Sequence, residues 1–356
     1  MKKIIPIIFS IFIISSLAGC SLFGNNPVST NKQASNSPAI TVVAKDTIAE
    51  YFPYTENKEY IFKGEGNEFA SYNVFVDYIN GPRAQIRLND GGTEVVQVIE
   101  NKNGELRLLY KKSECYFREN FLAKTYKNSE ILLKEPIEKG TAWTLSNKTK
   151  RSITNINVDV KTSLGIYKAV EVTTFAKDGK TKDYYVKNMG LVKTVFIVED
   201  GTITSTLDDI KSDRQFTQMI NFYYPNINDG KLYYKVDTLK FNTNDTTKIV
   251  FENAFKTAPK SYVGKLIGSN TKINSLYLNK DNMVYVDFSK DLVIGMNAGS
   301  EYESMILKCI TNTLGIYYGV DKVYITIDGE PYSSGHIAMS KGQFFTVNTN
   351  KNVEIK

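Results

Sequence analysis

The chain has 356 residues, of which 42% are hydrophobic and 12% aromatic, and this suits a packed globular protein long enough for two domains. The formal net charge is +6, and the Lys and Arg residues are spread along the chain instead of forming runs. Dispersed charge of this kind argues against nucleic-acid binding, so we expect no nucleic-acid partner.

The N-terminus has the pattern of a secretory signal. Lys2 and Lys3 precede an apolar stretch from Ile4 to Ile14, and small residues follow up to Cys20. A positive start, a short apolar stretch and small residues before a cleavage site are typical of a signal peptide, and the stretch is too short for a finished membrane span. An N-terminal membrane anchor is the alternative interpretation.

Residues 17–20, Leu-Ala-Gly-Cys, resemble the lipobox of bacterial lipoproteins. The resemblance implies that residues 1–19 are removed as a signal peptide and that Cys20 is lipidated, with palmitate among its acyl chains. Several acyl chains on one residue are enough for stable membrane attachment. We therefore expect an extracytoplasmic protein anchored to the outer face of the cytoplasmic membrane. Residues 20–45, which are rich in Ser, Asn, Thr and Pro, are expected to be a flexible tether.

Residues 46–213 are expected to form an all-β antiparallel domain. Successive segments are rich in β-branched and aromatic residues, many alternate with a period of two, and no long helical period interrupts them. The sheet is expected to curl or fold on itself. Turn signals separate the segments at Asn80-Gly81-Pro82, Asp90-Gly91-Gly92, Asn103-Gly104, Asp178-Gly179 and Asp200-Gly201.

The pattern changes near Gln218, and residues 214–356 are expected to form a small α/β (α+β) domain. Strand-like segments alternate here with two helical ones. The first helix is expected within residues 244–259, with Asn244 or Asp245 as its N-cap. We expect this helix and the next one to cover the same face of one sheet.

The clearest helix signal lies in residues 300–319. Ser300 and Glu303 have the spacing of a capping box at its start. Gly319 stands where a glycine commonly ends a helix. Between these points apolar residues recur at helical spacing and include Cys309, which predicts a core position for this thiol.

Four pieces of the second half share a recognisable order and spacing: Val286-Asp287-Phe288-Ser289, Gly299-Ser300 with Glu303, Thr313-Leu314, and Val323 to Gly329. Together they resemble the GerM-type (GerMN) domain of sporulation and germination lipoproteins of spore-forming Firmicutes, over roughly residues 219–335. The resemblance implies a small α/β module with no known catalysis, related to the ring-building motifs that assemble envelope complexes during spore formation. GerM-type lipoproteins often carry two such domains in tandem, whereas this chain has one.

Residues 328–336, DGEPYSSGH, gather two carboxylates, two serines and His336, the chain's only histidine. Asp-Gly is a dipeptide that hairpin turns favour, and a catalytic triad brings its members together from separate elements. We interpret this segment as a turn with a polar rim. No catalytic residue is therefore assigned, and we expect no enzyme.

Metal and cofactor sites are not expected either. With one histidine and two cysteines besides Cys20, a zinc site would depend on carboxylates, which is uncommon. No loop fits the twelve-residue calcium pattern. Cys115 and Cys309 are expected to be two separate buried thiols, with a disulfide as the alternative.

Tyrosines crowd the second half, and an exposed tyrosine face favours contact with protein or glycan. The alternative is that half of each tyrosine pair lies in the core. The candidate contact residues are Tyr223, Tyr224, Tyr317, Tyr318 and Tyr332.

The leading functional interpretation is a non-enzymatic cell-envelope lipoprotein whose GerMN-like domain binds or scaffolds other envelope proteins of a sporulation or germination complex. No small-molecule substrate is identified. The alternative is a peptidoglycan-binding, glycan-binding or wall-active enzyme lipoprotein, which would need a pocket where acids converge with shifted pKa values. A solute-binding lipoprotein fits poorly, because the first half shows no alternating helices.

Overall fold

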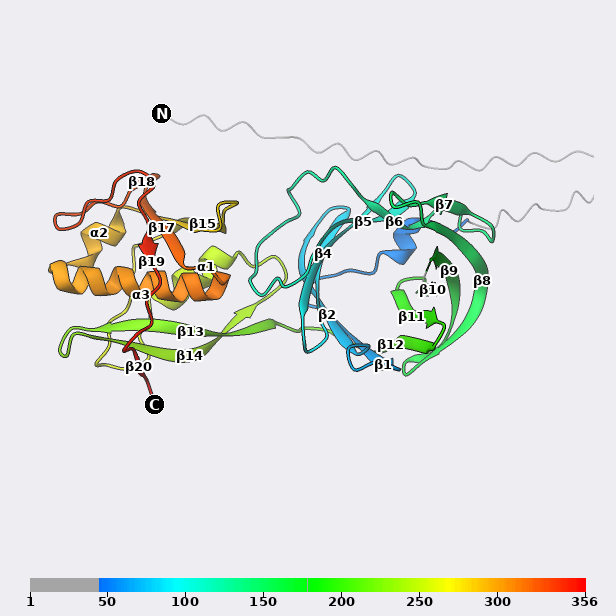
Figure 1. The fold of residues 1–356 in the computed structure, drawn as a ribbon, viewed down its shortest axis with the longest axis horizontal. Coiled ribbons are helices and arrows are strands. Elements are labelled where there is room, and N and C mark those ends of the chain that lie inside the picture. The colour runs from blue at the N-terminus through cyan, green and yellow to red at the C-terminus, as the bar shows by residue number, and fades with distance from the viewer. Residues whose placement is uncertain (1–44, 178) are drawn as a thin grey trace, which may run out of the picture. The chain divides into compact units, whose positions relative to one another are not determined.

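The computed structural model describes residues 45–177 and 179–356, and Lys45–Lys356 form one compact unit. The predicted signal peptide, the lipidation site at Cys20 and the tether up to residue 44 lie outside the described residues. The described chain is mostly antiparallel β-sheet with few helices (Figure 1). None of its helices is long and apolar enough to cross a membrane.

The first part of the described chain forms a 12-stranded antiparallel sheet that curls around its own interior (Figure 1). A short 3₁₀ helix, η1 (Ile48–Tyr51), precedes it, and the strand order is β6-β5-β4-β3-β2-β1-β12-β11-β10-β9-β8-β7. The strands are β1 (Glu59–Glu65), β2 (Tyr72–Asn80), β3 (Arg83–Asn89), β4 (Glu94–Lys102), β5 (Glu105–Lys112), β6 (Glu130–Lys134), β7 (Ala142–Thr144), β8 (Lys150–Thr162), β9 (Gly165–Ala176), β10 (Gly179–Val186), β11 (Gly190–Val198) and β12 (Gly201–Lys211).

Tight turns and bulges shape this sheet. Asn103 and Gly104 have φ of 54° and 69° between β4 and β5, the positive values that a two-residue hairpin loop requires. The pairings β1–β12, β2–β3 and β4–β5 each contain a register shift. Bulges bend and twist strands, so these irregularities allow the sheet to curl, as the sequence predicts.

The two outer strands of the sheet, β6 and β7, are joined by side chains and not by a backbone ladder. The indole nitrogen of Trp143 donates to the carbonyl oxygen of Ile131 at 3.0 Å. Arg151 donates to the same carbonyl at 2.6 Å and to the Glu130 carboxylate at 2.7 Å. We call this line of contacts the seam; it leaves neither edge of the sheet fully open.

The second part of the chain forms two smaller sheets and three helices. One sheet has the order β13-β14-β20, and the other has the order β15-β16-β17-β18 with β19 also paired to β17. The strands are β13 (Phe216–Asn226), β14 (Lys231–Phe241), β15 (Ile273–Leu278), β16 (Val284–Phe288), β17 (Lys322–Ile327), β18 (Glu330–Pro331), β19 (Phe345–Thr346) and β20 (Val353–Glu354). The helices are α1 (Thr247–Phe255), α2 (Asp291–Met296) and α3 (Ser300–Tyr318).

Helix α3 lies between the two smaller sheets and contacts β13 of one and β16 and β17 of the other (Figure 1). Helix α1 likewise contacts β14 of one sheet and β15 of the other. The expectation of one sheet is therefore incomplete, because a second sheet also packs against both helices. A helix packed on two sides needs buried residues around most of its circumference. Thirteen residues of α3 are buried, and they include Thr311 and Asn312, which lie outside the apolar stripe of the sequence pattern.

The predicted helix ends are partly correct. Gly319 ends α3 with φ of 68°, as its position predicts. Thr246, and not Asn244 or Asp245, is the N-cap of α1. The N-cap of α3 is Gly299, and no side chain caps that end, so the predicted capping box does not form.

One core cluster contains residues from both parts of the chain. Val98 and Phe117 of the first part belong to it together with Phe251 of α1. Cys115 and Cys309 also belong to it, and both are buried free thiols, as the sequence predicts. The two parts are therefore packed against each other through a shared apolar interior.

Candidate functional site

The structure buries all five tyrosines that the sequence nominates as contact residues. Tyr223 and Tyr224 on β13, Tyr317 and Tyr318 on α3, and Tyr332 after β18 have exposed fractions between 0% and 6%. The expected contact face cannot consist of these side chains. At the end of α3, Phe117 of the first part packs on Tyr318 and the backbone N–H of Arg118 donates to Tyr317, so residues of the first part cover both members of this pair.

Two of these buried tyrosines direct their hydroxyl groups to hydrogen-bond partners inside the protein. The Tyr317 hydroxyl donates to Gln218 and accepts the backbone N–H of Arg118, both at 2.9 Å. The Tyr332 hydroxyl donates to the Glu303 carboxylate at 2.8 Å. Buried tyrosines normally find such partners, so these residues stabilise the fold.

Three other tyrosines of the second part form an exposed ladder across β15, β16 and β17. Tyr277 is paired with Tyr285, and Tyr285 is paired with Tyr324, in the strand registers. The Tyr277 and Tyr285 rings stack with centroids 5.6 Å apart, and the Tyr285 and Tyr324 rings lie 5.1 Å apart at a tilt. Tyr277 is 39% exposed, and the other two are partly exposed. We call these three residues the tyrosine ladder.

Strand alternation explains why the ladder faces outward. In β16, Val284, Val286 and Phe288 are buried, whereas Tyr285 and Asp287 between them are partly exposed. Side chains alternate between the two faces of a strand, so the buried set faces α3 and the other set faces away from it. The alternation in "VYVDF" is visible in the sequence and could have indicated Tyr285 as an outward residue.

A polar group extends the same open face at the end of the strands. The Asp287 carboxylate accepts from the Thr326 hydroxyl at 2.6 Å, the Gly329 N–H at 2.8 Å and the Asn274 amide at 2.8 Å. Asp328 and Gly329 have φ of 48° and 86°, which confirms the predicted turn. Asp287 therefore fixes that turn through local hydrogen bonds.

Helix α1 fixes the start of the edge strand β15 through Glu252. Its buried carboxylate accepts the Ile273 N–H at 3.0 Å and binds Lys256 at 2.6 Å and Lys272 at 3.1 Å. Burial alone would raise the pKa of Glu252, but these hydrogen bonds outweigh burial and lower the pKa to about 2. The carboxylate is thus charged at neutral pH and holds the strand that carries Tyr277.

The segment 328–336 meets the buried carboxylate of Glu303 on α3. One oxygen accepts from Tyr332 at 2.8 Å and from Ser334 at 2.5 Å, and the other lies 2.8 Å from Nδ1 of His336. The sequence predicts that Glu303 caps the helix, and only the tertiary structure shows that its carboxylate holds residues 332–336 in place through hydrogen bonds.

The arrangement at Ser334 is that of a turn. Its hydroxyl donates to Glu303 and accepts the backbone N–H groups of His336 and Ile337, both at 3.0 Å. An activated serine would instead donate to the imidazole. These contacts agree with the interpretation of the segment as a turn with a polar rim.

We expect Glu303 to make stability depend on pH. Burial raises the pKa of Glu303, but hydrogen bonds from Ser334, His336 and Tyr332 outweigh it and hold the pKa below the ordinary 4.5. For a carboxyl group whose folded pKa is lowered, the stabilisation is present above the unfolded pKa and is lost as the pH falls through the folded pKa. Glu303→Gln should lower the free energy of unfolding at pH 7 by about 1–3 kcal/mol.

The measurement is urea unfolding of the wild type and of Glu303→Gln across the acidic range. The difference between them should shrink as the pH falls below about 4.5. Glu301→Gln, an exposed neighbour on the same helix, should change the free energy by no more than about 0.5 kcal/mol. A Glu303→Gln curve that runs parallel to the wild-type curve would contradict the assigned hydrogen bonds.

The fold class is thus a curled antiparallel sheet followed by a small α+β module, and the tyrosine ladder lies on that module. Residues 221–333 match the family model Germane, described as sporulation and spore germination. The match includes all three ladder residues and ends before Ser334. By sequence, no curated protein matches the chain.

Three solved structures are similar to parts of the chain. The first GerMN domain of the sporulation protein GerM from Bacillus subtilis is 22% identical, covering 36% of this chain and 97% of its own, with a TM-score of 0.28. A protein from Bacteroides fragilis described as exported, with a YmcC-like fold, is 12% identical over 46% of this chain and 99% of its own, with a TM-score of 0.29.

The third structure is described as a lipoprotein and comes from Parabacteroides distasonis; it is 14% identical over 45% of this chain and 98% of its own, with a TM-score of 0.26. With TM-scores this low, none of the three carries an argument about the chain. The fold and the site are therefore argued from this chain's own strands and side chains.

Proposed function

We propose that the chain is a lipoprotein of the cell envelope, attached through Cys20 to the outer face of the cytoplasmic membrane. Its Germane-type module binds another envelope protein during sporulation or germination and performs no catalysis. The pattern at residues 17–20 and the Germane match over residues 221–333 support this proposal. Tethering both partners to one membrane would raise their effective concentration.

The tyrosine ladder is the observation that carries the proposal. It is a partly exposed aromatic face within the matched residues, and tyrosine is enriched at protein interfaces. Strand β15, which carries Tyr277, lies at the edge of its sheet and has β16 as its one neighbouring strand. An edge strand beside an aromatic face suits a protein partner, because an extended segment can add to the edge through main-chain hydrogen bonds.

The test is crosslinking of the full-length, membrane-anchored chain in sporulating cells, followed by mass spectrometry of the captured proteins. We expect envelope proteins of sporulation to be captured by the wild type. Tyr277→Ser combined with Tyr285→Ser should lower their recovery at least about tenfold, because central aromatic contacts dominate binding energy.

Tyr262→Ser is the matched control. Tyr262 is 43% exposed and contacts Tyr233, outside the ladder. The Tyr262→Ser variant should capture as much envelope protein as the wild type, and all variants should unfold at the same urea concentration. Equal losses in the control and the ladder variant, or capture of no envelope protein, would exclude the ladder as the binding surface.

Glycan binding is the second candidate, favoured by the ladder rings. The partly exposed ladder rings can stack against sugar rings, and the Asp281 and Asp287 carboxylates beside them can accept hydrogen bonds from sugar hydroxyls. Enrichment of wall fragments without envelope proteins, lost in the ladder variant, would select this function.

A further inference from the structure

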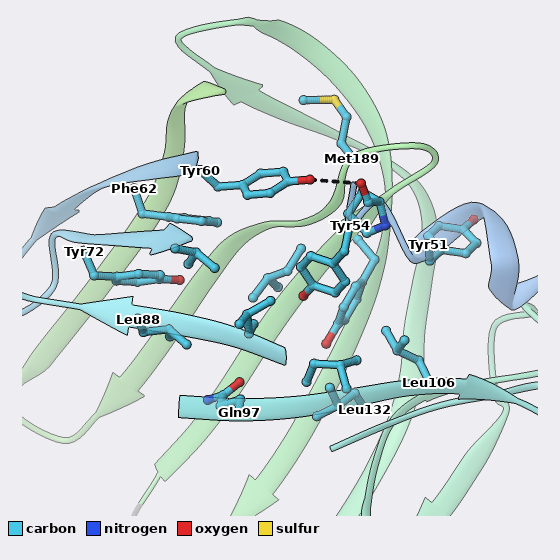
Figure 2. Close-up of a pocket in the computed structure, with 16 residues that line it drawn as sticks. Tyr51, Tyr54, Tyr60, Phe62, Tyr72, Leu88, Gln97, Leu106, Leu132 and Met189 are labelled. Atoms are coloured by element: carbon cyan, nitrogen blue, oxygen red, sulfur yellow. Dashed lines mark hydrogen bonds between the residues drawn. The ribbon is translucent and has the colours of Figure 1, made fainter. Parts of the chain in front are cut away.

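The curled sheet has an apolar inner face and an outer face that carries a second hollow. On the inner face, Tyr72 and Leu88 point into a small cavity of about 90 Å³ with a mostly apolar lining (Figure 2). Side chains alternate along a strand, so Asn73 and Asn89, the next residues on β2 and β3, belong to the outer face. A larger cleft, with a volume of about 290 Å³, lies on that outer face and is lined by both asparagines.

The strand registers bring the wall of this cleft together. Glu59 on β1 pairs with Phe75 on β2, and Phe75 pairs with Arg87 on β3, so the three residues form one row across the sheet. Asn73 and Asn89 pair with each other in the next row. All five residues line the cleft, which is therefore built on three neighbouring strands with backbone ladders between them.

The chain that follows β12 completes the cleft on its other side. The backbone N–H of Arg214 donates to the carbonyl oxygen of Asn57 at 2.9 Å, which fixes this segment beside the start of β1. Phe216 and Thr217, at the start of β13, line the cleft as well. The Phe216 ring lies 5.7 Å from the Phe75 ring, so two aromatic side chains form the apolar part of a mostly polar cleft.

The charged groups that line the cleft are compensated within the protein. The Glu59 carboxylate accepts from Nε of Arg214 at 3.3 Å. The buried guanidinium of Arg87 binds Asp77 at 3.1 Å and Glu94 at 2.7 Å. A charged ligand would find no uncompensated opposite charge here, so the cleft suits a neutral one.

Hydrogen-bonding capacity nevertheless remains at the rim of the cleft. The Glu59 carboxylate accepts from the Asn73 amide at 3.2 Å and keeps further lone pairs. Within the described part of the chain, the terminal nitrogens of Arg214, the amide oxygen of Asn73 and the Thr217 hydroxyl have no protein partner. These three side chains are exposed, so their polar groups can exchange water for the hydroxyls of a ligand.

We propose that this cleft binds one neutral sugar ring, with its C–H groups against Phe75 and Phe216 and its hydroxyls bound by Glu59, Asn73 and Arg214. A pyranose has an apolar face and a rim of hydroxyls that both donate and accept, which matches aromatic rings beside carboxylate, amide and guanidinium groups. Small-molecule pockets begin at about 300 Å³, so the volume suits a single ring.

The end of a wall glycan and a free monosaccharide share this chemistry. The cleft lies outside the residues that form the tyrosine ladder. The inference therefore goes beyond the proposed function and holds whichever partner the ladder binds.

Titration calorimetry and saturation-transfer difference NMR test the proposal on the full-length chain, in a detergent that has no sugar headgroup. The neutral probes are D-glucose and N,N′-diacetylchitobiose, and the charged probes are glucuronate and glucosamine. We expect saturation transfer to the ring protons of at least one neutral probe, and binding of both charged probes that is weaker by at least about fivefold. Tighter binding of diacetylchitobiose would assign the cleft to wall glycan, and tighter binding of glucose to a free sugar.

Two matched substitutions locate the binding. Thr217→Trp fills the cleft and should lower the affinity at least about tenfold. Thr238→Trp, at an exposed position of the neighbouring strand β14 outside the cleft, should retain the wild-type affinity. Arg214→Ala removes unpartnered donors from the rim and should weaken binding about fivefold.

Tyr277→Ser combined with Tyr285→Ser should bind the sugar as the wild type does, which separates the cleft from the ladder. A circular dichroism spectrum identical to the wild type shows that each variant is folded. The proposal would be overturned if neither neutral sugar received saturation from the wild type, or if a charged probe bound more tightly than both neutral ones. Unchanged binding by folded Thr217→Trp, or an equal loss in Thr238→Trp, would overturn it as well.

Discussion

Arg118→Ala is expected to lower the free energy of unfolding by about 3–5 kcal/mol, because it breaks a buried ion network. Arg118 is fully buried, with its Nε 3.7 Å from the carboxylate of Asp77, which is also fully buried. Arg87 binds the same carboxylate at 3.1 Å. Removing one of the two guanidinium groups leaves Asp77 with half of its charge compensation in a site closed to water.

The same side chain links segments that are distant in sequence. Its guanidinium donates to the backbone carbonyls of Asp77 at 2.6 Å and Asn242 at 2.9 Å, and to that of Asp245. It also lies over the Tyr78 ring at 4.2 Å. Arg118→Ala should therefore loosen the contact between the curled sheet and the β14–α1 connection as well as lower stability.

Urea unfolding followed by both Trp143 fluorescence and far-ultraviolet circular dichroism measures both effects. Trp143, the only tryptophan, reports on the curled sheet alone. In the wild type the two signals should change together, and in Arg118→Ala they should separate. Lys168→Ala removes an exposed pair with Asp159 and should cost less than about 1 kcal/mol. If Arg118→Ala also lowered the free energy of unfolding by less than about 1 kcal/mol, the buried ion network of Asp77, Arg87 and Arg118 would be contradicted.

Phe251→Ala is the second large effect, with an expected loss of about 3–5 kcal/mol. Phe251 is fully buried on α1, and its ring centroid lies 4.8 Å from that of Tyr317, 5.7 Å from that of Phe255 and 6.1 Å from that of Phe222. Truncation removes the transfer free energy of the ring and leaves a cavity among aromatic neighbours that cannot collapse freely.

The comparison within α1 makes this prediction sharp. Ile249→Ala changes a residue that is 45% exposed on the same helix and should alter the free energy by about 0.5 kcal/mol or less. Phe251→Leu should fall between the two, because most of the apolar volume remains. Equal urea midpoints for Phe251→Ala and Ile249→Ala would show that α1 does not pack as described.

Local sequence signals predicted much of the fold. Asn103 and Gly104 form their turn, and Gly319 ends α3, because positive φ is a property of one or two residues and does not depend on the rest of the chain. Eleven of the twelve strands of the first part follow the same logic, since alternation and turn residues are both short-range patterns, whereas the three-residue strand β7 was not predicted. Helix α3 begins at Ser300, where the prediction places it.

What the sequence could not show depends on distant contacts. A pair such as Tyr317 and Tyr318 looks half exposed on a helix that has one covered side. Both are buried because Phe117 and Arg118, some two hundred residues earlier in the chain, also contact them. Likewise, Glu303 has the spacing of a capping residue. Its carboxylate is instead bound by Tyr332 and His336, which follow it by about thirty residues in the sequence. The tyrosine ladder was missed because its members come from three separate strands.

The seam of the large sheet has a mechanical consequence. Every neighbouring pair from β6 through β1 and β12 to β7 is held by a backbone ladder, whereas β6 is joined to β7 by the side chain of Trp143 and to β8 by that of Arg151. A transient parting at this line breaks a few side-chain hydrogen bonds and leaves every ladder intact. The curled sheet can thus part along this line without the loss of any backbone ladder.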